Sequence, residues 1–127
     1  MCIRDRYHPD RLQVVQKCLR VTGVVDVIRD EADGDKHILL RLDTQFQNLL
    51  QPANQDERGD LVVEPVCVGQ VTQSDAQATC ASDPDPFSGA LPSVGEHVWM
   101  EGRYVYDEDH NGWAELHPLY RYGQVSP

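Results

Sequence analysis

The side chains best suited to chemistry gather where two predicted strands meet a turn, within residues 94–118. Asp107, Asp109 and His110 lie in the turn, and Glu115 and His117 follow it on the next strand. Successive strand residues point to opposite sides, so Glu115 and His117 share one face, as two ligands of one ion must. Carboxylate oxygens favour Ca²⁺, whereas imidazoles with a carboxylate favour Zn²⁺. The pattern indicates a site for a divalent cation.

His37 is the sixth candidate ligand. It follows an acidic turn at residues 30–35 and lies at the start of another predicted strand. If the two acidic turns meet at one end of a barrel, His37 completes the site. The competing interpretation is that both turns are ordinary solvated hairpin ends, and that His117 simply packs beside Pro118.

An EF-hand calcium loop is excluded in this segment. Asp107, Asp109, Asn111 and Gly112 match the first half of such a loop. Pro118 stands where the loop requires a bidentate glutamate, and the flanking residues indicate strands rather than helices. A weaker calcium site of another kind stays open.

Two other functions compete with metal binding. Outward-facing Trp99 and Trp113, with Arg103, could bind a single-stranded nucleic acid or an oligosaccharide by stacking, although the net charge of −10 opposes nucleic acid. A metal-dependent hydrolase would need an open metal position at Glu115 and His117, and no P-loop, nucleophile elbow or zincin helix occurs. We therefore expect a binding or accessory module for a small ligand or protein, rather than an enzyme.

Five predicted strands position these residues. They cover residues 18–29, 36–43 and 60–67, and then the two arms of a hairpin that turns at Asn111-Gly112. Short helical segments are expected at residues 44–51 and 72–80, and loops at residues 52–59 and 81–93. Alternation in the hairpin predicts an inward face made of Val98, Met100, Tyr104, Tyr106, Ala114 and Leu116.

The fold class that follows is all-β, with one or two short helices. Gly23 interrupts the first strand and permits a bulge, so that one long strand can serve two sides of a small barrel. The element order, with the phrases at residues 21–25 and 94–102, resembles an OB-fold, which implies a five-stranded Greek-key barrel. A small β-sandwich is the rival fold. The segments LRVTGVV, GDLVVEPVC and NGWAELHPL also resemble a family of small prokaryotic proteins of uncharacterised activity.

The ends of the chain and its composition bound this interpretation. Residues 1–6 resemble a translated sequencing adapter, and residues 7–17 are expected to form a lead-in arm. The barrel is expected over residues 18–123, with a short tail at 124–127. No apolar run approaches the roughly 20 residues that a membrane-spanning helix needs.

Cysteine usage bears on the compartment. Cys67 and Cys80 end two neighbouring predicted elements and could form a disulfide, which would favour an extracellular or cell-surface location. The alternative is a pair of buried thiols in a cytoplasmic protein. Cys18 would then stay unpaired, or pair with a segment missing upstream.

Overall fold

The computed structural model describes residues 12–30, 36–65 and 90–125 of the chain. Within these ranges the expected all-β class is confirmed. The strands are β1 (Leu12–Asp30), β2 (Lys36–Leu42), β3 (Leu61–Val63), β4 (His97–Asp107) and β5 (Trp113–Gln124). The described residues also form three short 3₁₀ helices, η1 (Thr44–Leu49), η2 (Pro52–Glu57) and η3 (Glu108–His110).

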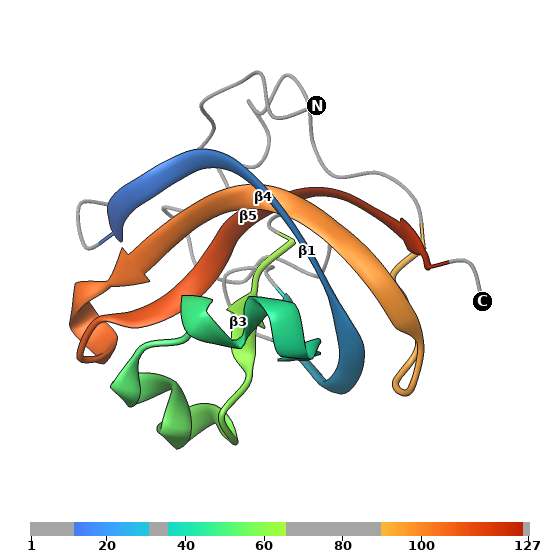
Figure 1. Cartoon of the computed structure of the whole chain (residues 1–127), viewed down its shortest axis with the longest axis horizontal. Coiled ribbons are helices and arrows are strands. Elements are labelled where there is room, and N and C mark those ends of the chain that lie inside the picture. Colours follow the sequence, from blue (N-terminus) through green and yellow to red (C-terminus); the bar gives the residue numbers. More distant parts are fainter. Residues whose placement is uncertain (1–11, 31–35, 66–89, 126–127) are drawn as a thin grey trace.

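The five strands form one sheet that closes on itself. They lie side by side in the order β1-β2-β3-β5-β4, and β4 pairs in turn with β1. Every pair is antiparallel except β3 with β5, which is parallel. Figure 1 shows the long strands β1, β4 and β5 passing over one side of the molecule, with the helices η1 and η2 near β3. A single closed sheet does not fit the rival sandwich, which needs two sheets.

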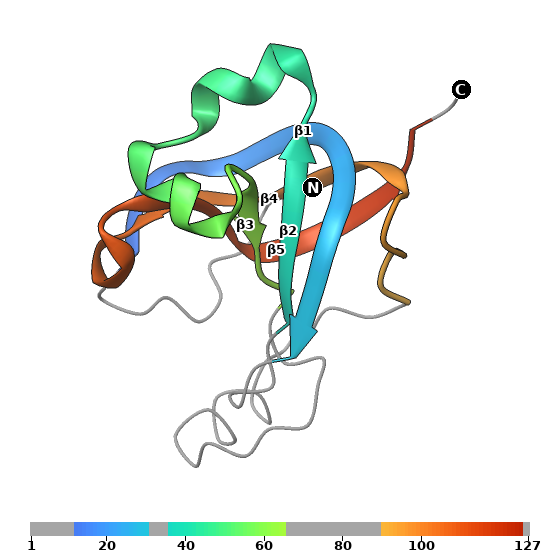
Figure 2. The ribbon, with the colours of Figure 1, turned by 90° about the horizontal axis from the view of Figure 1, so that it is seen from below.

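The first strand serves two sides of the barrel, as its glycine predicted. Gly23 is paired with Val98 of β4 on one side and with Leu42 of β2 on the other. A Cβ atom at Gly23 would lie 2.5 Å from the carbonyl oxygen of Arg41, so only glycine fits this close approach. Figure 2 shows β1 bending sharply between the part beside β4 and the part beside β2.

Two details of β1 differ from expectation. The pairing with β2 becomes irregular between Val25 and Val27, two residues beyond the glycine. The strand also begins at Leu12, within the segment expected as a lead-in arm. Leu12 is paired with Asp107 at the far end of β4, because the long β4 offers hydrogen-bonding partners along its whole edge.

The barrel interior is an apolar core whose side chains come from alternate positions of every strand. The inward face predicted for the hairpin is confirmed, with Tyr106 packing against the core from a partly buried position. The fully buried members are Val21, Val25, Ile38, Leu40, Leu42, Leu61, Val63, Val98, Met100, Tyr104, Ala114, Leu116 and Leu119.

The short helices match the sequence only in part. The helical turn expected at residues 44–51 is confirmed as η1, whereas residues 52–59, expected as a loop, contain η2. Pro52 stands in the first turn of η2, and Gln51 and Asn54 cap it reciprocally. The helix expected at residues 72–80, most of the loop expected at residues 81–93 and the last part of the third predicted strand lie outside the described residues.

Candidate metal centre

A polar cluster lies on the outer face of the barrel, where β3 runs between β2 and β5. In these strands the inward positions belong to the core, so the alternate residues point outward. Outward-facing Leu39, Val62 and Trp113 form a second, smaller apolar cluster. The polar residues on the same face are His37 of β2, Glu64 next to the end of β3, and Glu115 and His117 of β5.

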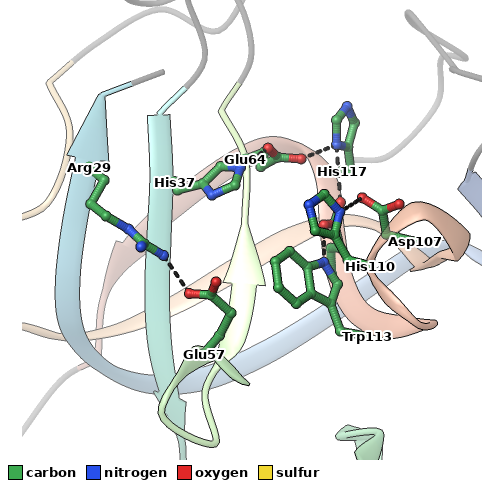
Figure 3. A network of polar contacts seen from close by, with 9 residues as sticks. Arg29, His37, Glu57, Glu64, Asp107, His110, Trp113 and His117 are labelled. Atoms are coloured by element: carbon green, nitrogen blue, oxygen red, sulfur yellow. Dashed lines mark hydrogen bonds and ion pairs between the residues drawn. The ribbon is translucent and has the colours of Figure 1, made fainter. Parts of the chain in front are cut away.

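Glu64 links the two histidines. Its Oε1 contacts Nε2 of His37, and its Oε2 contacts Nδ1 of His117 (Figure 3). The same Nδ1 of His117 lies 3.2 Å from Oε1 of Glu115. The register explains the meeting, because Val63 is paired with Ile38 on one side and with Leu116 on the other. Three strands thus bring together residues from distant parts of the sequence.

A second set of contacts holds the cluster from the side of the hairpin turn. The indole Nε1 of Trp113 donates a hydrogen bond to Oε2 of Glu115, at 2.5 Å. The His110 ring stacks on the Trp113 ring, with 4.2 Å between centroids and 5° between planes. Nδ1 of His110 lies 3.0 Å from Oδ2 of buried Asp107. Figure 3 shows His110 joined to Asp107 and lying beside the Trp113 ring.

The cluster is buried, and burial shapes its charges. Burial raises the pKa of Glu115 to about 7, and the nearby charge of Glu64 acts in the same direction. Burial would lower the pKa of His117, but the charge of Glu64 and the hydrogen bonds to both carboxylates raise it to about 10. Burial likewise opposes ionisation of Glu64, yet the charge and hydrogen bond of His117 hold the pKa of Glu64 well below its usual range. Without an ion, the cluster is therefore held together by an ion pair between His117 and Glu64.

The same atoms can hold a metal ion. One ligand atom each from Glu64, Glu115 and His117 lies within 4.8 Å of the other two. A metal with ligands at about 2.0–2.2 Å fits a set of this spacing after small side-chain shifts. Two carboxylates and an imidazole are ligands that Zn²⁺ and related ions accept. The ion would take the place of the proton on Nδ1 of His117.

The six ligands proposed from sequence fall into two groups. His37, Glu115 and His117 meet around Glu64, as described above. Asp107 and His110 form a separate pair beyond the Trp113 ring, while Asp109 is exposed and gives its backbone N–H to Asp107. Among the described residues, the group able to share one ion is formed by Glu64, Glu115 and His117.

Glu64 was missed by the sequence analysis. It follows three apolar residues of β3 and precedes Pro65, within a segment that the sequence predicted only as a strand. The available signal was alternation: Leu61 and Val63 point inward, which makes Glu64 an outward neighbour of Val62. A carboxylate placed next to a run of three apolar strand residues, on their outward face, is a candidate ligand for this reason.

The residues expected to stack on a ligand are mostly covered. Trp113 is 5% exposed and Arg103 is 1% exposed. Trp99 is partly buried: the Arg20 guanidinium lies 4.1 Å from its ring centroid, and a Cβ on Gly123 would come within 2.8 Å of the ring. These positions leave little aromatic surface for a base or sugar.

The expected disulfide between Cys67 and Cys80 lies outside the described residues and stays a prediction. Cys18 is disulfide-bonded, so of the two alternatives given for it, an unpaired cysteine is wrong.

Comparisons with known proteins do not extend these observations. No protein-family model, curated protein or solved structure matches this chain. No helix in the described part of the chain is long and apolar enough to cross a membrane.

Proposed function

We propose that this chain is a metal-binding accessory module, in which one divalent transition-metal ion joins β3 to β5. The observation that carries the proposal is the buried meeting of ligand atoms from Glu64, Glu115 and His117 within 4.8 Å. Zn²⁺ is the first candidate ion, because the set combines an imidazole with carboxylates.

A second observation concerns the other nitrogen of His117. Nε2 of His117 is completely buried and has no hydrogen-bond partner among the described residues, so the polar network around this ring is incompletely satisfied. The ion would bind Nδ1, and Nε2 would then carry the ring's remaining proton.

We further propose that the barrel is of the OB type. The strand order, the closure of β1 on β4 and the parallel pairing of β3 with β5 support this assignment. In such barrels the loop between β4 and β5 flanks the usual ligand face. Here that loop carries His110, which stacks on Trp113 beside the proposed centre.

The test is a thermal melt of the purified chain, stripped with EDTA and then supplied with ZnCl₂. Free Zn²⁺ at about 100 times its dissociation constant stabilises the folded state by about 2.7 kcal/mol. For a domain of this size we expect the midpoint to rise by about 10 °C.

Two isosteric variants and one control make the test specific. Glu64→Gln and Glu115→Gln keep the side-chain shape but replace the carboxylate, so their melting should not respond to Zn²⁺. His97→Ala removes an exposed histidine bound to Asp43, away from the described cluster, and should respond like the wild type. An unchanged wild-type midpoint with Zn²⁺, Mn²⁺ or Ca²⁺ would contradict the proposal, as would Glu→Gln variants that respond normally.

A further inference from the structure

We infer that Trp113 determines which ion this centre prefers. Its indole N–H occupies one carboxylate oxygen of Glu115, so that the residue offers a single oxygen to a metal. The centre therefore accepts small ions of the Zn²⁺ class and discriminates against Ca²⁺. This inference rests on the proposed metal-binding function and names the ions that the site takes.

The two oxygens of Glu115 have different partners. Oε2 accepts the hydrogen bond from Nε1 of Trp113 at 2.5 Å, whereas Oε1 faces Nδ1 of His117 at 3.2 Å. Both Glu115 and His117 are at most 1% exposed, so water does not compete for these oxygens. Only Oε1 is directed at the shared ligand position.

The packing around Trp113 keeps its indole N–H on Oε2 of Glu115. Its ring packs with Leu39 and Val62 of the outer apolar cluster and is 5% exposed. His110 stacks on the ring, and Asp107 in turn holds His110 through its Nδ1. Turning the indole away would break the stack and leave a buried N–H without an acceptor, which is unfavourable.

The two carboxylate oxygens of Glu64 also have different partners. Its Oε1 contacts His37 and its Oε2 faces His117, so it too presents one oxygen to the shared position. Ca²⁺ requires six to eight oxygen ligands and commonly takes a carboxylate through both oxygens. Two single oxygens and one imidazole nitrogen instead match the small coordination number of Zn²⁺.

The experiment measures Zn²⁺ and Ca²⁺ affinities of the full chain by competition with a chromophoric chelator. The test variant is Trp113→Phe, which keeps an aromatic ring to stack on His110 but lacks the N–H. Outer hydrogen-bond partners of metal ligands are commonly worth 10- to 100-fold in affinity. We expect about a tenfold loss of Zn²⁺ affinity and a smaller ratio of Zn²⁺ to Ca²⁺ affinity. Trp99→Phe, the matched control on β4, should leave both affinities unchanged.

A fluorescence measurement tests the inference without disturbing Trp113. The chain has two tryptophans, so Trp99→Phe leaves Trp113 as the sole tryptophan, which is excited selectively at wavelengths that tyrosine does not absorb. Zn²⁺ should then change its emission, because the ion alters the charge on the carboxylate that the indole N–H contacts. Absence of any change on saturation would overturn the inference even if Trp113→Phe fails to fold.

The outcomes separate this inference from the proposed function. If the wild type binds no Zn²⁺, both fail. If it binds Zn²⁺ through Glu64 and Glu115, yet folded Trp113→Phe keeps the wild-type ratio of Zn²⁺ to Ca²⁺ affinity, only the role of Trp113 is refuted.

Discussion

Asp60 and Asp26 form a carboxyl pair whose titration should contribute to the pH dependence of stability near neutral pH. Asp60 is 2% exposed, and burial, together with the hydrogen bond and charge of Asp26, raises its pKa from 3.8 to about 7. The hydrogen bond from Asp60 lowers the pKa of Asp26, and Arg58, whose Nε lies 3.0 Å from Oδ2 of Asp26, lowers it further. The charges of Arg58 and Arg41 oppose the rise at Asp60 but do not cancel it. The folded protein therefore keeps one proton on this pair well above pH 4.

The direction of the effect follows from proton binding. A carboxyl with a raised pKa stays protonated in the folded state at pH values where the unfolded chain has released its proton. Stability is therefore lost as pH rises from about 4, and the loss is complete above pH 7. Each pKa unit corresponds to about 1.36 kcal/mol, so a rise of about three units gives a loss of about 2–3 kcal/mol between pH 5 and 8. The lowered pKa of Asp26 acts only below about pH 4, outside this window.

The assay is urea unfolding in EDTA at a series of pH values, comparing the wild type with Asp60→Asn. The amide cannot ionise but keeps an N–H that can face Asp26. We expect the free energy of unfolding of Asp60→Asn, relative to the wild type, to increase by about 2–3 kcal/mol from pH 5 to pH 8. Asp56→Asn, at an exposed position of η2, is the control and should run parallel to the wild type. If the pH dependence of the free energy of unfolding of Asp60→Asn also runs parallel to that of the wild type, the assignment of the proton to this pair is refuted.

Two further predictions concern packing and buried hydrogen bonds. Gly23→Ala should lower the free energy of unfolding in urea by about 1–3 kcal/mol, because the new Cβ would meet a backbone carbonyl. Gly123→Ala should lower it by less, because the new Cβ would meet only the Trp99 side chain. Equal effects of the two substitutions would argue against the close approach in β1. Asn54→Ala should lower the free energy of unfolding by about 2–4 kcal/mol in the same assay. The buried Asn54 amide forms hydrogen bonds with both the N–H and the carbonyl of Ala114, and it caps η2. A loss below about 1 kcal/mol would show that water replaces these hydrogen bonds.

Alternation made much of the barrel predictable. The residues of β2, β4 and β5 repeat with a period of two, so local pattern alone separates Ile38, Met100 and Leu116, which line the core, from their outward neighbours. The hairpin turn was equally local: Asn111 and Gly112 both adopt positive φ, as the sequence pair suggested. Gly23 marked the two-sided strand, although the reason for the glycine is the close approach of the Arg41 carbonyl on β2.

The centre itself was only half predictable. The spacing of Glu115 and His117 is enough to predict that they share a face of β5. Their contact with Glu64 depends on the parallel pairing of β3 with β5, which no local sequence pattern indicates. The burial of the cluster was also not predicted, because side chains that point out of the barrel were expected to be exposed to water. Leu39, Val62 and Trp113 give the outer face an apolar layer of its own, and the polar cluster lies beside that layer.

The two-sided pairing of β1 has a consequence for how the chain reaches this fold. Arg20 on β1 contacts Glu101 on β4, 81 positions later. During synthesis the first half of β1 is made long before its partner, while β2 follows soon after the second half. Until β4 emerges, the first half of β1 is an open edge whose backbone groups can pair with another chain. Non-local pairings of this kind slow folding, so barrel closure should be the late step and the step most exposed to aggregation.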